Sequence, residues 1–500
     1  MQTVRSRKKT RDWTYFVKVA IGLALMIGFQ FIPAPAPITQ AGFSTLGMFL
    51  GLIFLYAFVD SVWPNFVAIC IFALHAFDVY PAAAQGSGID VAGNAVFGYS
   101  IPFFIIGMLI LNYAMESCGL LRRIALWFVT RKVAQKSPWA FTFMLFLATL
   151  VLALFMDVSP TTVVMIAIAH SIFECLGFKE GDSWPRMVIT GITWIVCIGF
   201  WMTPIGHNIV ILFTGMIAAA TGQSVNLFAY MMVGVPVGLA LFLLMFLYFR
   251  FVVRPDVSHF KNVDYNTVET MRPGKMDLRE RLIAIIGAVA LFLLIIPGFL
   301  EVIIPGNTFS AVMDGLSTTY IIYAAIALMA IIRVEGKPLL DISEACARIS
   351  WPQVILVGSI VMVALAMAES TTGIPQWVSE NVGPLLTSGS HVFTFIVIAV
   401  LCVILTNVMN NVAVGAIFCT ICAPLCATIG LNAYILTMVI TICSQMGFTT
   451  PAAFPTIALA TSDKYCNSGY VLRHGISMTG LSLIVSVALI YPISTLVFGG

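Results

Sequence analysis

The sequence predicts an all-α polytopic membrane protein with about 11 transmembrane helices and two re-entrant hairpins in an inverted repeat. Of its 500 residues, 60% are hydrophobic and only 9% are charged, whereas a soluble domain carries about 25% charged residues. Two apolar segments are also too long for a single pass and have polar centres. The composition therefore excludes a soluble domain, and the long segments predict hairpins among the helices.

The apolar segments that suit one crossing can be taken in order along the chain. A helix needs about 20 apolar residues to cross the hydrocarbon core. The run behind the basic stretch MQTVRSRKKTRDW has no clear cleavage site, so we interpret it as a first helix and not as a signal peptide. The predicted spans are 14–33, 44–58, 63–78, 98–117, 187–216, 229–249, 282–300, 318–332, 351–368, 433–460 and 475–498.

The basic residues predict the orientation of these spans. All 25 Lys and Arg residues fall in alternate connections, which are 1–18, 119–137, 179–186, 250–281, 333–348 and 464–473. Basic connections stay on the cytoplasmic side of a membrane. We therefore expect a cytoplasmic N-terminus and an outer C-terminus, in a bacterial-type inner or plasma membrane.

The same sorting constrains the two long segments, 138–177 and 391–430. Each must return to the side from which it enters, the first to the cytoplasmic side and the second to the outer side. Two full spans each would satisfy this parity. The alternative is a pair of re-entrant hairpins whose polar tips meet inside the membrane, where such backbone is tolerated in protein or a wet cavity.

The two halves of the chain also repeat. YAMESCGL (113–120) is similar to AMAESTTGI (366–374), and each is followed by a polar-tipped hairpin and a helix interrupted by Thr-Pro. The equivalent positions lie about 250 residues apart, as expected for the inverted repeats of transporters. The predicted organisation is listed in chain order: the N-terminus and first helix (1–43), a first repeat (44–249) with hairpin 138–177 and broken helix 187–216, a cytoplasmic linker (250–281), and a second repeat (282–500) with hairpin 391–430 and broken helix 433–460.

Several stretches resemble one known family. They are the early helix GMFLGLIFLYAFVDSVWP, the segment AMESCGLLRRIAL, and the breaks TPIGHN and FTTPAAFPT. At these residues the chain resembles the divalent anion/sodium symporter family, the carriers of dicarboxylates, citrate and sulfate. The resemblance runs from about residue 44 to the end. The family's Ser-Asn-Thr motif at each hairpin tip reads Ser159-Pro160-Thr161 and Asn410-Asn411-Val412 here.

The resemblance implies sites for sodium and substrate at the tips. At the first sodium site, Phe155 and Pro160 stand where the family has side-chain oxygens, which leaves Ser159 with Gly199 opposite. The second site keeps its oxygens, so one retained sodium site is favoured over two; its residues are Thr406, Asn411, Met446 and Gly447. The residues expected to bind substrate are Ser159, Thr161, Thr162, Thr203, Pro204, His207, Asn410, Asn411, Thr450 and Pro451.

The physical chemistry of a tip explains why it can hold both ions. Helix N-termini present free N–H groups and partial positive charge, which suit an anion. Carbonyl groups at the preceding helix ends suit a small cation, and hydroxyl and amide side chains complete both sites without a buried formal charge. Asp157 beside the first tip is either a cation or proton site or a helix cap, and both interpretations stay open.

The leading hypothesis is a secondary active transporter that moves a small anion, a di- or tricarboxylate, with sodium. The resemblance implies a homodimer in the lipid bilayer, with a scaffold and an elevator-like part that contains both hairpins. Sodium-independent exchange of organic anions and a cation or proton antiporter remain alternatives. A membrane hydrolase is disfavoured because no nucleophile elbow, metal-ligand cluster or phosphate loop accompanies Ser159, and nothing beyond the short basic N-terminus supports nucleic-acid binding.

Overall fold

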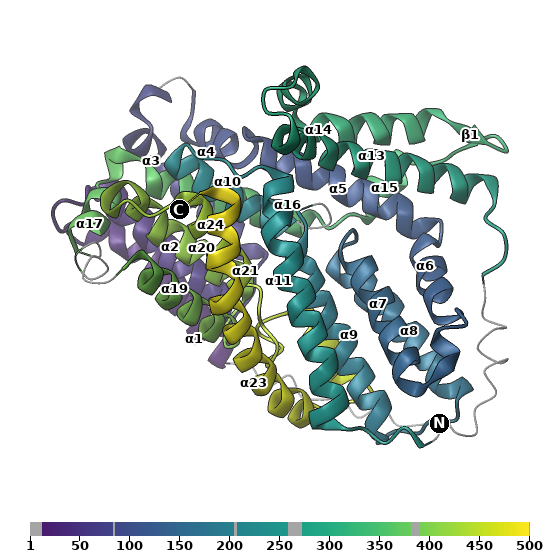
Figure 1. The fold of residues 1–500 in the computed structure, drawn as a ribbon. Coiled ribbons are helices and arrows are strands. Elements are labelled where there is room, and N and C mark those ends of the chain that lie inside the picture. The colour runs from purple at the N-terminus through teal and green to yellow at the C-terminus, as the bar shows by residue number, and fades with distance from the viewer. Residues whose placement is uncertain are drawn as a thin grey trace, which may run out of the picture.

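The computed structural model describes residues 13–83, 86–204, 208–258, 273–381, 384 and 390–499, and it is built almost entirely of helices (Figure 1). Within these residues, nine helices are long and apolar enough to cross a membrane. The predicted all-α polytopic class is therefore confirmed.

The helices of the first half begin close to the predicted spans. They are α1 (Trp13–Gly28), α2 (Gln40–Phe58), α3 (Trp63–Val79), α4 (Gly88–Phe97), α5 (Ser100–Ser117), α6 (Leu120–Val129), α7 (Pro138–Ala153), α8 (Val158–Cys175), α9 (Ser183–Met202), α10 (Asn208–Thr221) and α11 (Leu227–Tyr248). Short 3-10 turns at Phe29–Phe31, Pro81–Ala83 and Ala134–Lys136 and a π-helical turn at Phe249–Val253 complete this half.

The second half repeats the pattern after the linker. Its helices are α13 (Leu278–Ile303), α14 (Thr308–Ile331), α15 (Ile342–Arg348), α16 (Trp351–Ala368), α17 (Ile374–Asn381), α19 (His391–Thr406), α20 (Asn411–Ile429), α21 (Ala433–Cys443), α22 (Pro455–Ser462), α23 (Ser468–Val485) and α24 (Tyr491–Phe498). A 3-10 turn (Ser370–Thr372) and a π-helical turn (Ser486–Ile490) join neighbouring helices, and the two-residue strands β1 (Arg333–Val334) and β2 (Lys337–Pro338) pair antiparallel.

The hairpins are α7–α8 and α19–α20, and they begin in the same way. Ser137 caps α7 by accepting a hydrogen bond from the backbone of Ala140 at 3.0 Å, and Ser390 caps α19 by accepting one from Phe393 at 3.3 Å. A serine side chain at this position satisfies a backbone N–H group that has no partner within the helix. Equivalent caps therefore start both hairpins, as the predicted repeat requires.

The helices that face the hairpins are both broken. The first is α9 followed by α10, and the second is α21 followed by α22. The second piece of each broken helix packs on the hairpin of the other half, so that α10 contacts α20 and α22 contacts α8. This exchange brings the two halves of the sequence into one packed unit.

Aromatic side chains hold this unit together. The indole Nε1 of Trp194 on α9 donates to the carbonyl of Phe448 in the second break at 3.1 Å. The hydroxyl of Tyr230 on α11 donates to the carbonyl of Trp201 at 2.7 Å, close to the end of α9. Buried Tyr and Trp side chains normally find such a polar partner. These bonds fix the position of both breaks relative to α9 and α11.

Some helix boundaries depart from those expected from the sequence. The predicted connection 79–97 contains a helix, α4, which packs on α3 and α16. The span predicted at 318–332 begins earlier, at Thr308, and is kinked at Ser317 with a φ of 68°. The second break is longer than its Thr-Pro pair indicates, because α21 ends at Cys443 and α22 begins at Pro455. Tertiary packing decides each of these boundaries.

Figure 1 shows where the connections with and without basic residues lie in the fold. The helix α6 and the strand β1, which belong to basic connections, lie at the right of the view, whereas α17 and the C-terminus lie at the left. The helices α13, α14 and α5 form the upper right of the molecule, and α11 and α23 cross its centre. The basic connections that contain α6 and β1 therefore lie at the other end of this view from α17, whose connection contains no Lys or Arg.

Candidate functional site

The second hairpin tip lies against the second break. Asn410 caps α20 and accepts hydrogen bonds from the backbone of Val412 and Ala413 at 2.9 and 3.3 Å. Asn411 is buried, and its backbone N–H donates to the carbonyl of Ala453 at 3.4 Å. The tip and the break are thus joined by backbone as well as by side chains.

Three residues predicted as sodium ligands, Thr406, Asn411 and Met446, each take part in a contact between this tip and the break. The hydroxyl of Thr406 donates to the carbonyl of Ser444 at 2.5 Å, and the side-chain amide of Asn411 donates to Oε1 of Gln445 at 2.5 Å. The carbonyl of Met446 faces the same tip, because it accepts a hydrogen bond from a tip side chain at 2.9 Å. Hydroxyl and amide groups of the tip thus lie against unwound backbone at residues 444–446. Transporters use unwound backbone carbonyls of this kind to coordinate Na⁺.

Gly447 is required for this close approach. A Cβ atom at this position would lie 2.8 Å from Cβ of Ala453 and 3.1 Å from the carbonyl oxygen of Thr406. A larger residue would separate the break from the tip. The predicted residue Thr450 donates to the carbonyl of Asn407 at 2.9 Å, and Pro451 is exposed beside it.

Two buried amides at this tip were not predicted from the sequence. Asn407 ends α19, and Gln445 follows α21, and both are buried against the residues named above. Each lies within a long segment that is apolar on both sides, at TNVMNN and at SQMGF. Because polar side chains inside membrane segments are functional candidates by default, that rule could have found these two residues from the sequence.

The first hairpin tip is capped by Asp157. Its carboxylate Oδ1 accepts a hydrogen bond from the backbone of Ser159 at 3.2 Å, which makes it the N-cap of α8. Ser159 is exposed at the tip. Thr162 donates to the carbonyl of Val158 at 2.8 Å, whereas the hydroxyl of Thr161 is fully buried and has no hydrogen-bond partner among the described residues.

The first break contacts this tip in a similar manner. The hydroxyl of Thr203 donates to the carbonyl of Leu154 at 2.5 Å, and Pro204 is buried after it. Gly199 lies directly on the hairpin, because a Cβ atom there would be 2.5 Å from Cβ of Ala153. The predicted residue His207 lies outside the described residues. The first tip therefore gathers fewer side-chain oxygens toward its break than the second tip does.

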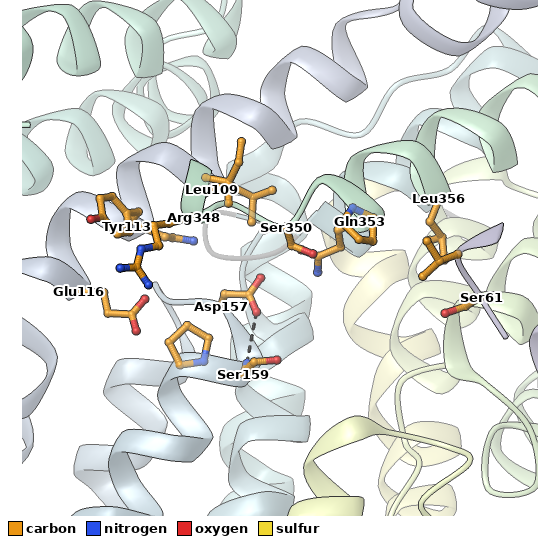
Figure 2. Close-up of a pocket in the computed structure, with 15 residues that line it drawn as sticks. Ser61, Leu109, Tyr113, Glu116, Asp157, Ser159, Arg348, Ser350, Gln353 and Leu356 are labelled. Atoms are coloured by element: carbon orange, nitrogen blue, oxygen red, sulfur yellow. Dashed lines mark hydrogen bonds between the residues drawn. The ribbon is translucent and has the colours of Figure 1, made fainter. Parts of the chain in front are cut away.

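A cavity of about 350 Å³ opens at the first tip (Figure 2). Its lining comes from the tip, from α5, α15 and α16, and from the turn between α2 and α3. It comprises Ser61, Val62, Leu109, Asn112, Tyr113, Glu116, Asp157, Ser159, Pro160, Arg348, Ile349, Ser350, Pro352, Gln353 and Leu356. In Figure 2, Glu116 and Arg348 lie on one side of Asp157, and Gln353 and Ser350 lie on the other. The hairpin tip thus borders a polar space formed with α5, α15 and α16.

The cavity also contains a buried acceptor without a donor. Asn112 on α5 is 4% exposed, and its Oδ1 has no hydrogen-bond partner among the described residues. A buried amide oxygen in this state is costly, so such a group favours a polar occupant or water. No group of three or more His, Cys, Asp or Glu residues that could hold a metal ion occurs in the described part of the chain.

A family profile described as citrate transporter matches residues 10–443. The chain belongs to the citrate transporter family. Its relatives include the sodium-dependent dicarboxylate transporter SdcS of Staphylococcus saprophyticus, which is 27% identical over 331 residues, or 64% of this chain and 62% of that protein. SdcS of Staphylococcus aureus strain bovine RF122 is 26% identical over 298 residues, or 58% of this chain and 56% of that protein.

This member of the citrate transporter family therefore aligns with less than two thirds of the length of these curated relatives. A solved structure covers more of it: the crystal structure of the Alcanivorax borkumensis YdaH transporter matches 96% of this chain and 97% of its own, with a TM-score of 0.59 and 15% identity. That likeness shows the fold. The family and the names of the relatives describe transporters and not enzymes.

Proposed function

We propose that this protein is a secondary active transporter that carries a small anion, a di- or tricarboxylate, across the membrane together with sodium. The observation that carries the proposal is the second tip, where Thr406, Asn407 and Asn411 bond three consecutive residues of the unwound break, Ser444, Met446 and Gln445. The names of the relatives, which are sodium-dependent dicarboxylate transporters, support the same substrate class and coupling ion.

An elevator motion is part of the proposal. The moving part would contain both hairpins, both broken helices, α11 and α23–α24, and the scaffold would contain α1–α5 and α13–α17. The cavity in Figure 2 supports this division, because the hairpin supplies one wall and the other walls come from α5, α15, α16 and the turn between α2 and α3. The scaffold would form the contact of a homodimer, and the N-terminus would face the cytoplasm. The repeat boundaries at residues 44, 249 and 282 belong to the same proposal.

Exchange without sodium is the second candidate, and one observation favours it. At the first tip, Phe155 and Pro160 bring no side-chain oxygen to the motif, and the break offers Gly199 and the Thr203 hydroxyl, which is already bonded to Leu154. If the second site were also unused, the protein would exchange one organic anion for another. A transport assay with and without Na⁺ separates the two candidates.

The test is uptake of radiolabelled succinate, citrate, tartrate and sulfate into proteoliposomes, with Na⁺ or choline outside. We expect concentrative uptake of at least one carboxylate with Na⁺ only. Uptake that needs internal anion and is equal in choline would establish exchange, and uptake of none of the four anions would contradict the proposal.

The variant Asn411→Ala should abolish Na⁺-dependent uptake, because it removes both the amide that meets Gln445 and an oxygen at the tip. The matched control is Asn381→Ala, at the exposed end of α17, which should retain wild-type uptake. Near-normal uptake by Asn411→Ala would refute the assignment of the second tip.

A further inference from the structure

Asn407 stands at the centre of the second tip. It is the C-cap of α19, it is only 7% exposed, and it lies between Thr406 and the helix that begins at Asn411. Its side chain contacts the hairpin, the second break and α23, which are separate elements of the fold. No other side chain named at this tip reaches all three.

The carbonyl oxygen of the Asn407 side chain is surrounded by donors. It accepts hydrogen bonds from the backbone N–H groups of Phe448 and Thr449 at 2.9 and 3.2 Å. The hydroxyls of Thr449 and Thr479 also lie within hydrogen-bond distance, at 3.0 and 3.1 Å. An amide oxygen has two lone pairs, so this atom has no capacity left for a cation.

The amide nitrogen of Asn407 uses both of its hydrogens. One donates to the carbonyl of Val403 on α19 at 2.7 Å, and the other donates to the carbonyl of Met446 in the break at 2.9 Å. Met446 supplies one of the carbonyls expected to bind sodium. The side chain therefore holds this carbonyl at a fixed position relative to the tip.

The backbone of Asn407 extends the same connection toward the expected substrate residues. Its carbonyl accepts hydrogen bonds from the hydroxyls of Thr449 and Thr450 at 3.0 and 2.9 Å. Thr450 is one of the residues expected to bind substrate. The conformation of the break from Met446 to Thr450 is therefore set by one buried residue of the hairpin.

We propose that Asn407 is a positioning residue that forms the sodium site of the second tip without itself binding the ion. This inference rests on the proposed sodium-coupled function and deepens it. The residue orients the Met446 carbonyl toward the ion and keeps the 446–450 backbone against the tip. Preorganised ligands of this kind bind more tightly because the protein does not have to order them when the ion arrives.

The substitution Asn407→Asp tests the amide nitrogen selectively. The new carboxylate keeps an oxygen for the donors of Phe448, Thr449 and Thr479, so the buried donors remain paired. It replaces the NH₂ group with an oxygen that faces the carbonyls of Val403 and Met446, and these oxygens repel one another. The Met446 carbonyl then turns away from the ion site.

We expect the Na⁺ concentration for half-maximal uptake to rise at least fivefold in Asn407→Asp, with the KM for the carboxylate at saturating Na⁺ within twofold of wild type. Acidification should reverse part of this rise, because the protonated carboxyl group donates to the Met446 carbonyl again. Heat unfolding of the detergent-purified protein should show the same change. The NaCl concentration that gives half of the maximal stabilisation, measured against choline chloride, should rise by the same factor. This second measurement reports ion binding without transport.

The matched control is Asn226→Asp, at the exposed N-cap of α11, where the carboxylate still accepts from Phe228 and Ala229. It should show wild-type Na⁺ dependence in both measurements. If Asn407→Asp does not fold, Thr479→Val removes one donor to the Asn407 oxygen and should raise the half-maximal Na⁺ concentration about twofold to threefold.

An unchanged or lowered half-maximal Na⁺ concentration in Asn407→Asp, or in Thr479→Val when only that variant folds, would overturn this assignment and leave the proposed function intact. A wild-type protein whose uptake and heat stability are the same in Na⁺ and choline would overturn the sodium coupling and this assignment together. The two failures are therefore distinguished by the wild-type measurement.

Discussion

Individual polar residues at the two tips differ in how completely they are paired. The amide of Asn407 is saturated by protein groups, whereas the hydroxyl of Thr161 and Oδ1 of Asn112 have no partner among the described residues. Buried polar groups in folded proteins are nearly always bonded. Paired residues at the second tip therefore build its structure, whereas Oδ1 of Asn112, which lines the cavity at the first tip, is available to an occupant.

Asp157 is the residue at which structure and ion binding can be separated. The structure confirms that it is a helix cap, through its bond to the Ser159 backbone. Asp157→Asn keeps a capping oxygen, and Asp157→Ala removes it, at a cost of about 0.5–2 kcal/mol. If the cap is its whole role, Asp157→Asn should retain both heat stability and uptake, whereas Asp157→Ala should unfold at a lower temperature.

The measurement is thermal unfolding in detergent together with uptake in proteoliposomes. Loss of uptake in Asp157→Asn without loss of stability would contradict the cap-only role. The carboxylate charge would then be needed for transport, as the cation or proton hypothesis requires.

At the scale of elements, α9 is the helix on which the first hairpin rests. Nearly all of α9 is buried by protein and not exposed to lipid. Small residues let neighbouring helices approach closely in membranes. Gly191 and Gly199 supply such points, since a Cβ atom at either would lie within 2.5 Å of Phe146 or Ala153 on α7.

The substitution Gly199→Ala should therefore force α9 and α7 apart. Overpacking of this kind costs about 1–3 kcal/mol, so the unfolding temperature in detergent should fall by several degrees. The matched control is Gly480→Ala on α23, where an added Cβ meets no atom within 4 Å. It should be neutral or slightly stabilising, because Ala is favoured over Gly in a helix by about 1 kcal/mol. An equal effect of both substitutions would contradict the close contact.

The spans were predictable at this scale because each apolar run is long and bounded by polar or basic residues. The helix α4 was not, because GIDVAGNAVF (88–97) is short and holds Asp90 and Asn94. Its apolar face is covered by α3 and α16, and packing against other elements commonly overrides local propensity.

At the scale of the whole molecule, the orientation in the membrane is open to a direct test. Cys175 is exposed at the end of α8, next to the basic connection that contains Lys179. A membrane-impermeant maleimide should label it in inverted membrane vesicles and not in intact cells, if the basic connections are cytoplasmic. Cys175→Ser should remove that label.

Two partly buried thiols, Cys118 and Cys466, lie beside or within two other basic connections. Burial raises the pKa of each of these thiols, so less of the reactive thiolate is present at neutral pH. They should therefore react more slowly than Cys175, and faster as the pH rises. Rapid labelling of Cys175 from outside intact cells would reverse the predicted topology.

The sequence by itself determined the class of protein, its helical hairpins and the residues of their tips. This was possible because lipid allows few spanning structures, and because polar residues in an apolar run stand out against it. Thr406, Asn411 and Met446 were expected before their contacts were seen for another reason, which is their place in the resemblance to the symporter family.

The tertiary structure decided which of those residues meet. The exchange of α10 and α22 between the hairpins, and the contacts of Asn407 with the break and with α23, join positions far apart in the chain. No local pattern encodes such a pairing, because it depends on how buried helices pack and on which buried donors find acceptors. For this reason the sequence pointed to both tips, and the structure distinguished a tip that is bonded throughout from one that borders an open cavity.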